Sequence, residues 1–227
     1  TGSPMPLNPA LRWQLIGPLL VVLGWDALGL DLPLAHWSGT VQGFALRDQW
    51  FLSAVLHNGA RDLGWVALLA LTVCIARPVG VLKALSRRER AWMMGCIWLS
   101  ILSISLIKGM STTSCPWDLQ AFGGQARWVS HWAWGMSDGG GGHCFPAGHA
   151  STGFAFLAGY AWLRAVRPQA ARWWLAATLA AGVVLGMAQQ IRGAHFASHT
   201  LWTAWLCWAC ALLLHHWSRR PSAKPAG

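Results

Sequence analysis

Six apolar runs, each near the length that crosses a lipid bilayer, dominate this sequence. They cover residues 13–30, 62–75, 91–107, 145–163, 173–191 and 200–214. A transmembrane helix needs about 20 mainly apolar residues, because no water in the hydrocarbon core can satisfy its backbone. The second run is short, and residues 50–60 are expected to form an interfacial helix that leads into it. The pattern predicts an all-α protein, a six-transmembrane-helix bundle with a long outer loop between the third and fourth helices.

The composition supports a membrane protein over a soluble one. Only 11% of the 227 residues are charged, whereas about a quarter are charged in an ordinary soluble domain. The 18 tryptophans fit the membrane–water interface, where this residue is enriched. These values exclude a disordered chain and a fibrous repeat. Residues 1–4 resemble a cloning scar, and residues 5–227 are expected to form a single integral membrane domain.

The basic residues predict the orientation of the bundle. With a cytoplasmic N-terminus, the outer connectors hold Arg47, Arg61, Lys108, Arg127 and Arg192, and the inner segments hold the other twelve of the 17 Lys and Arg residues. Excess Lys and Arg in short loops marks the cytoplasmic side, so both termini are expected there. The net charge of +10 is then mainly a topology signal, and no nucleic-acid partner is expected. The twelve are Arg12, Arg77, Lys83, Arg87, Arg88, Arg90, Arg164, Arg167, Arg172, Arg219, Arg220 and Lys224.

Three polar segments fall on the predicted outer face. They are residues 108–116, 144–151 and 189–199, and the first two bound the long loop 108–144. Long irregular loops are often functional. The three segments come from different parts of the chain and meet at one membrane surface, so together they predict a functional site there.

The residue types in these segments suit the cleavage of a phosphate ester. Lys108 and Arg192 are cations that can hold phosphate oxygens. Gly148 permits close backbone approach at a helix N-terminus, which favours an anion. His149 and His195 can divide the work, since one imidazole can attack phosphorus while the other protonates the leaving oxygen.

The order of these residues resembles the type-2 phosphatidic acid phosphatase superfamily, whose members are six-span membrane lipid phosphatases. Its first block is lysine, six residues, arginine-proline, and Lys108 reaches Cys115-Pro116 at that spacing. Its second block is proline-serine-glycine-histidine, and residues 146–149 read Pro-Ala-Gly-His. The resemblance covers about residues 90–217.

The third block of the family is serine-arginine, five residues, histidine, three residues, aspartate. His195 occupies the position of the histidine, and His199 stands where the family has aspartate. Gln189 falls on the position of the arginine, while Arg192 lies about one helical turn further on.

The resemblance implies a role for each matching residue. His195 would be the nucleophile that forms a phosphohistidine, and His149 the general acid that later activates water. Lys108 and Arg192 would clamp the phosphate with backbone N–H groups near Gly148. No metal and no cofactor are implied.

The departures from the family pattern leave two gaps. Cys115 removes the arginine of the first block, and Arg192 or Arg127 would restore that charge. His199 replaces the aspartate that orients the nucleophile. Neutral His199 accepts the same hydrogen bond, and Asp118 is an alternative orienting acid.

Cysteine placement predicts one disulfide. Four of the six cysteines lie within apolar runs, where thiols behave as small apolar residues. Cys115 and Cys144 are the two in the outer loop, and a bond between them is expected in an oxidising compartment. It would tie the first block to the second.

The other polar residues have plainer interpretations. His36 and His57 are expected to be interfacial or packing residues, and Asp26 is either a solvated residue near the end of the first run or part of a pathway. Imidazole and thiolate also suit zinc, but the candidate zinc ligands of the outer loop have a spacing that fits no standard ligand frame. Those candidates are His131, His143, Cys144 and His149.

The sequence therefore predicts a lipid phosphatase of the bacterial inner membrane with its site facing the periplasm. Candidate substrates are undecaprenyl diphosphate, phosphatidylglycerophosphate, phosphatidic acid and lipid A phosphates. Two alternatives stay open: a phosphotransferase that passes the phosphoryl group to another lipid, and a non-catalytic transporter or assembly subunit. The oligomeric state is not predicted.

Overall fold

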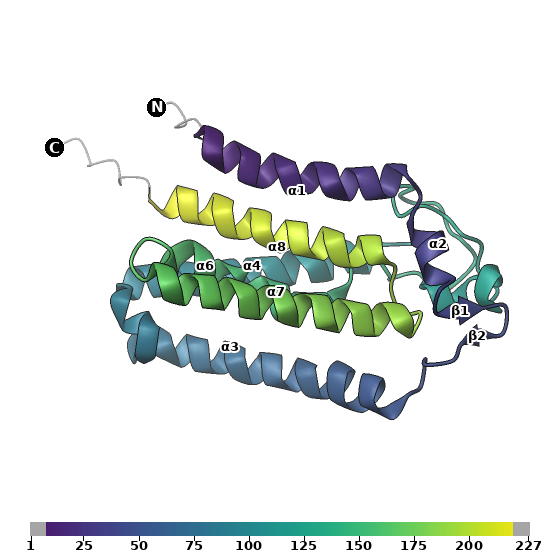
Figure 1. Cartoon of the computed structure of the whole chain (residues 1–227), viewed down its shortest axis with the longest axis horizontal. Helices are drawn as coiled ribbons and strands as arrows, with labels where there is room; N and C mark the ends of the chain where they lie inside the picture. Colours follow the sequence, from purple (N-terminus) through teal and green to yellow (C-terminus); the bar gives the residue numbers. More distant parts are fainter. Residues whose placement is uncertain (1–7, 220–227) are drawn as a thin grey trace.

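The computed structural model describes residues 8–219, so the expected cloning scar at 1–4 lies outside the described part. Its long helices are α1 Pro9–Ala27, α3 Ala60–Ala76, α4 Arg87–Met110, α7 Pro168–Ile191 and α8 Ala197–Ser218. A broken helical segment between α4 and α7 consists of α5 Gly148–Phe154, a 3-10 turn Ala155–Leu157 and α6 Ala158–Leu163. These helices lie side by side and alternate in direction along the chain (Figure 1).

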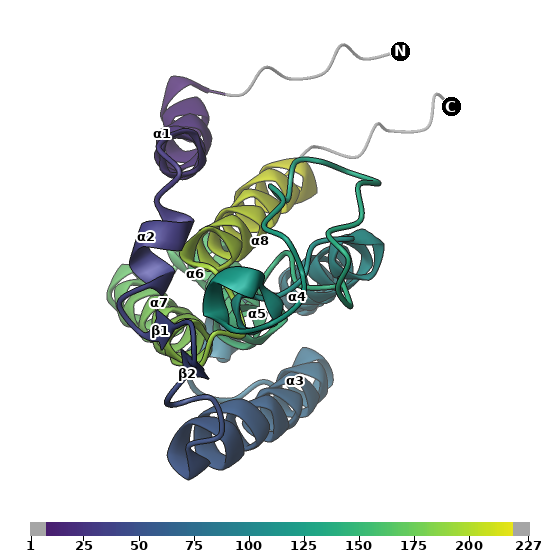
Figure 2. The same ribbon diagram turned by 90° about the vertical axis from the view of Figure 1, so that its right-hand side faces the viewer.

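Most of the short elements gather at one end of the bundle, which Figure 2 views from outside. They are α2 Asp31–Ala35, the antiparallel strands β1 Gly39–Thr40 and β2 Gly43–Phe44, and the 3-10 turns Pro116–Asp118 and Gln120–Phe122. Both turns belong to residues 111–147, which connect α4 to α5. Phe44 and Phe196 pack against Phe122 in a small core that holds this connection at the start of α8.

Four helical stretches are long and apolar enough to cross a membrane. They are Phe51–Ala84, Arg87–Met110, Pro168–Ile191 and Ala197–Ser218, and they make the chain an integral membrane protein. The first stretch contains the expected helix at 50–60, since a π-helical segment Phe51–Gly59 continues directly into α3, and its interfacial position remains a prediction. The span criterion does not select α1 or the broken α5–α6 segment.

A buried arginine joins α3 to α4 at the opposite end from the loop. Arg90 lies in the first turn of α4, after a capping box formed by Ser86 and Glu89. Its guanidinium donates to the carbonyl oxygens of Ile75 and Leu82. These bonds satisfy carbonyls that the end of α3 and the following 3-10 turn Gly80–Ala84 would otherwise leave unpaired.

The α5–α6 segment packs very closely on α7 around the 3-10 turn that interrupts it. A Cβ at Gly153 would collide with the backbone of Gly182, and a Cβ at Gly159 would collide with the ring of Trp174. Trp174 Nε1 also donates to the carbonyl of Phe156, in the 3-10 turn, at 2.7 Å. The break in the helix is thus supported from α7.

Candidate active site

The three polar segments of the sequence meet at the loop end of the bundle. A disulfide joins Cys115 to Cys144, which confirms the expected bond. The backbone N–H of Trp117 donates to the carbonyl of Gly193 at 2.9 Å, and that of Ala147 donates to the carbonyl of His199 at 3.2 Å. Each segment is therefore bonded directly to another.

A tight turn between α7 and α8 places the two histidines of the third segment. Gly193 follows the end of α7 with a φ of 75°, a left-handed conformation that glycine adopts without strain. The chain then enters α8, so that His195 precedes the helix and His199 lies in its first turn. Both side chains are buried, with exposed fractions of 4% and 2%.

The Nδ1 atoms of His195 and His199 lie 3.4 Å apart. The Sγ atom of Cys144, in the disulfide, lies 3.5 Å from His195 Nδ1. The Nδ1 edge of His195 is thus occupied by protein groups. Its Nε2 atom is left for attack on a substrate.

Burial keeps His195 uncharged. Desolvation holds the pKa of its imidazole well below the usual range, and the nearby positive charge of Lys108 lowers that pKa further. An imidazole must be neutral to act as a nucleophile. His195 therefore has the protonation state that attack on phosphorus requires at neutral pH.

A cavity of about 290 Å³ is lined by three further residues of the predicted site. Lys108, in the last turn of α4, lines it together with Gly148 and His149 at the start of α5. A Cβ at Gly148 would lie 3.7 Å from Lys108 Cδ, so Gly148 and the Lys108 side chain are close neighbours in this wall. Arg61 of α3 lines the same cavity.

His149 has an aromatic partner that sequence reasoning missed. Its ring stacks on that of His57, with centroids 3.7 Å apart and planes inclined by 27°. His57 was expected to be an interfacial or packing residue; it does pack, but against the proposed general acid. Its Nδ1 atom lies 3.0 Å from Asn58 Oδ1, which fixes the orientation of the His57 ring.

Arg192 is held in place by protein oxygens. Its Nε donates to the carbonyl of Arg47 at 2.7 Å, and its Nη1 donates to Gln189 Oε1 at 3.4 Å. Its charge acts on the rings of both His149 and His57. Arg192 thus lies within electrostatic reach of the cavity that contains Lys108.

His149 and His195 line different cavities. His195 borders a space of about 300 Å³ together with Trp37 and Gln190, whereas His149 borders the Lys108 cavity. The two lining sets do not overlap. Lys108, which lines the His149 cavity, nevertheless acts electrostatically on His195.

Arg127 and Asp118 lie in the connection between α4 and α5. The backbone N–H of Arg127 donates to the carbonyl of Asp138, and the carbonyl of Asp118 accepts from Ala126. The side chain of Arg127 is exposed and that of Asp118 is half-buried. Their roles as phosphate ligand and orienting acid remain predictions.

Two carboxylates other than that of Asp118, those of Asp138 and Asp26, are largely buried at the loop end of the bundle. Asp138 is 2% exposed and accepts from Ser114 Oγ at 2.9 Å and from the backbone N–H groups of Ser114 and Gly140. Its signal in the sequence was only an acidic residue beside the glycine run 139–142. Asp138 holds the segment after Lys108 against the glycine run.

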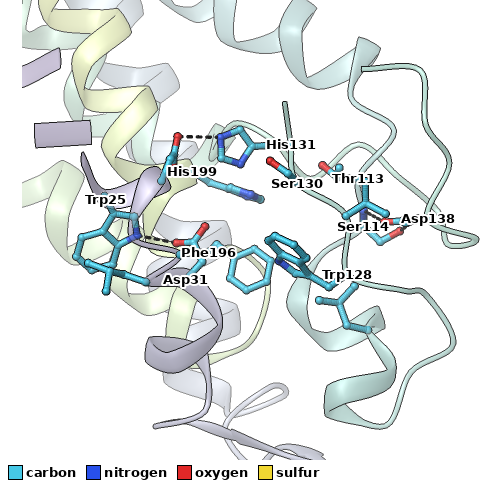
Figure 3. Close-up of a pocket in the computed structure, with 15 residues that line it drawn as sticks. Trp25, Asp31, Thr113, Ser114, Trp128, Ser130, His131, Asp138, Phe196 and His199 are labelled. Atoms are coloured by element: carbon cyan, nitrogen blue, oxygen red, sulfur yellow. Dashed lines mark hydrogen bonds and ion pairs between the residues drawn. The ribbon is translucent and has the colours of Figure 1, made fainter. Parts of the chain in front are cut away.

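Asp26 lies in a small pocket of about 70 Å³, shown in Figure 3. Its Oδ2 atom accepts from Trp132 Nε1 at 2.9 Å and Trp202 Nε1 at 2.8 Å, and contacts His131 Nε2 at 3.2 Å. The side chain is only 11% exposed. Of the two interpretations of Asp26, the solvated end residue is wrong, because this carboxylate ties α1 to α8 and to the loop.

Two groups of potential metal ligands occur among residues 8–219. One is Cys115, Cys144 and His195, whose sulfurs are joined in the disulfide, and the other is Asp26, Asp31 and His131. The alternative zinc set of the loop is not a cluster in this part of the chain, because His131 pairs with Asp26 and Cys144 is oxidised.

A helical membrane protein that places buried histidines beside a lysine and an arginine has the groups needed to cleave phosphate esters. The sequence matches the family model of the PAP2 superfamily over residues 89–222, more than half of the chain. The chain therefore belongs to the PAP2 superfamily, which confirms the resemblance to type-2 phosphatidic acid phosphatases. Members of this family are phosphatases, and membership supports a phosphoric monoester hydrolase. No curated protein and no solved structure matches the chain.

Proposed function

We propose that this protein is a six-span lipid phosphatase that hydrolyses a lipid phosphate or diphosphate at the outer face of a bacterial inner membrane. The observation that carries the proposal is the contact between a cationic cavity and an apolar groove. The groove, of about 560 Å³, lies between α3, α5 and α7 and shares Gly64, Thr152 and Phe156 with the Lys108 cavity. A phosphate headgroup and its hydrocarbon tail need two such adjoining environments.

The lining of the groove suits a hydrocarbon chain. Small residues of α3 and α7, including Ala67 and Ala177, alternate with Leu63 and Leu185 along its walls. Burial of apolar surface contributes about 25 cal/mol per Å², so a long tail supplies much of the substrate's binding energy. The tail would fix the headgroup beside Lys108 and His149.

The distribution of charge and cysteine supports the proposed orientation. The disulfide lies at the loop end, and such bonds persist in oxidising compartments such as the periplasm. Arg87 begins α4, Arg164 follows the end of α6 and Arg172 lies near the start of α7. These helix ends are opposite to the loop end (Figure 1), as expected for the cytoplasmic side.

The proposed reaction has two steps and uses only side chains of this chain. In the first, His195 Nε2 attacks phosphorus, the bond from phosphorus to the leaving oxygen breaks, and His149 donates a proton to that oxygen. Burial lowers the pKa of His149 to about 3 in the free protein, so His149 takes up this proton when the negative charge of the bound phosphate raises its pKa. In the second, His149 takes a proton from water, which attacks the phosphohistidine and releases inorganic phosphate. Lys108 and Arg192 stabilise the negative charge of the phosphoryl group in both transition states.

Phosphate release from purified protein tests the proposal. We expect release from at least one of undecaprenyl diphosphate, phosphatidylglycerophosphate, phosphatidic acid and lipid A, in the presence of a chelator. His195→Ala should abolish it, and His36→Ala, which changes an exposed histidine at the same end, should not. Radiolabelled substrate should leave an acid-labile phosphohistidine on the wild type. Full activity of His195→Ala would refute the mechanism.

A further inference from the structure

Arg61 is a cation of the cavity that belongs to none of the three polar segments. It lies in the first turn of α3, and it precedes the region 89–222 that matches the family. The structure nevertheless places it on the wall of the cavity that also contains Lys108 and His149. Arg61 therefore adds a charge that the family pattern does not include.

Arg61 lies on the general-acid side of the cavity. Its charge acts on His149 and on the stacked His57. The cation that acts on His195 is instead Lys108. In the proposed reaction, His149 faces the leaving oxygen, so Arg61 belongs to the leaving-group side.

The guanidinium of Arg61 is available to a ligand. Its Nε and Nη2 atoms donate to Asp62 Oδ1 at 3.3 Å, and the two side chains are 53% and 67% exposed. Exposed ion pairs of this kind contribute little energy. A phosphate in the cavity would compete easily with the Asp62 carboxylate.

The position of Arg61 along α3 also relates it to the groove. Gly64, about one helical turn further along α3, lines both the cavity and the apolar groove. A substrate with its tail in the groove and its terminal phosphoryl group at the histidines would pass Arg61 between these two points. A second phosphate in the substrate would lie there.

Resting on the proposed function, we propose that Arg61 binds the leaving phosphate of a lipid diphosphate and makes the enzyme selective for diphosphates over monophosphates with the same tail. His195 Nε2 forms a bond to the terminal phosphorus, and the bond from that phosphorus to the bridging oxygen breaks. The electron pair goes to the bridging oxygen, and the lipid monophosphate departs with its charge paired to Arg61.

The two substrate classes differ in what they need from the site. A departing phosphate carries stable negative charge, because its second pKa is near 6, so a fixed cation stabilises it. A lipid monophosphate instead releases an alkoxide, which needs the proton of His149. Arg61 has no leaving oxyanion to bind in that case, so its loss should affect only diphosphate cleavage.

The test compares farnesyl diphosphate with farnesyl monophosphate. Arg61→Gln should lower kcat/KM for the diphosphate by about 10- to 100-fold, the effect of one charged hydrogen bond, and Arg61→Lys should retain part of it. For the monophosphate, the change should stay within roughly threefold. The control is Arg47→Gln, since Arg47 stacks on Trp117 at 4.5 Å, and it should change both substrates by the same factor.

An equal loss on both substrates would overturn the proposal, and so would an unchanged kcat/KM for the diphosphate. The unfolding temperatures of Arg61→Gln and wild type without ligand show whether the variant folds. If the wild type released phosphate from no lipid, the hydrolase proposal would fail, but Arg61 would still be tested by thermal shift. Inorganic pyrophosphate should then stabilise the wild type more than inorganic phosphate does, and Arg61→Gln should lose that difference; a wild type that shows no difference overturns the inference.

Discussion

His195 and His199 face each other through their Nδ1 atoms at 3.4 Å. Two imidazoles in this arrangement can share at most one proton between these atoms, so one ring donates and the other accepts. In the proposed mechanism, His199 would do the orienting work that the family assigns to an aspartate.

The first prediction concerns this replacement. His199→Asp restores the family residue, and a carboxylate stabilises a developing imidazolium at His195 better than a neutral ring does. A charged hydrogen bond exceeds a neutral one by about 1–1.5 kcal/mol, so kcat should rise roughly tenfold with little change in KM. His199→Asn is the control, since it keeps an acceptor of similar size without the charge and should give no increase. A lower kcat for His199→Asp than for His199→Asn would contradict the orienting role.

The second prediction concerns pH. Burial and Lys108 lower the pKa of His195 well below 6.5, and the neutral ring is the reactive form. Activity should therefore persist as the pH falls through 6.5 and decline only below it, as measured by kcat/KM of the free enzyme. Lys108→Gln removes a positive charge and raises that pKa, so the acid limb should move to higher pH. Arg47→Gln should leave the limb in place, and a limb at pH 6.5 or above in the wild type would argue against a buried neutral His195.

Much of the loop end could be predicted because its signals are local. The spacing from Lys108 to Cys115 and from His195 to His199 identified the family, and the two loop cysteines identified the disulfide. Long apolar runs identified the helices. In each case, residues close together in the sequence are enough to predict the feature.

The rest depends on tertiary contacts that short-range patterns do not contain. His57 stacks on His149 from a distant segment that contains no recognisable motif. In the sequence, Arg61 is only a basic residue that precedes an apolar run. Asp26 and His131 contact each other although they are 105 residues apart in the sequence. The separate cavities of His149 and His195 follow from side-chain packing, which spacing cannot describe.

The third prediction concerns the disulfide. Cys115 and Cys144 are 29 residues apart, and a crosslink of this length contributes about 3–4 kcal/mol in the chain-entropy model. The pair Cys115→Ser with Cys144→Ser should lower the unfolding temperature and the activity, because the disulfide touches His195. The control pair, Cys74→Ala with Cys210→Ala, changes two free thiols and should retain activity.

Mass spectrometry checks the same bond directly. Alkylation of the denatured wild type should label the four free cysteines without reductant and all six after reduction. Six labels before reduction would show that the bond is not formed in the purified protein.

The fourth prediction concerns the carboxylate that joins α1 to the loop. Asp26→Ala leaves the indole N–H groups of Trp132 and Trp202 without their acceptor. Trp202 is buried, and a buried donor without a partner costs about 1–3 kcal/mol. The variant should unfold roughly 5 °C or more below the wild type, and a protease should cut residues 111–147 faster. Asp62→Ala is the matched control, since that carboxylate is 67% exposed and should have little effect. Equal unfolding temperatures for the two variants would mean that Asp26 does not hold α1 in place. A loss of activity in Asp26→Ala far below its unfolding temperature would show instead that His131, which contacts both Asp26 and His199, transmits its position to the histidine pair.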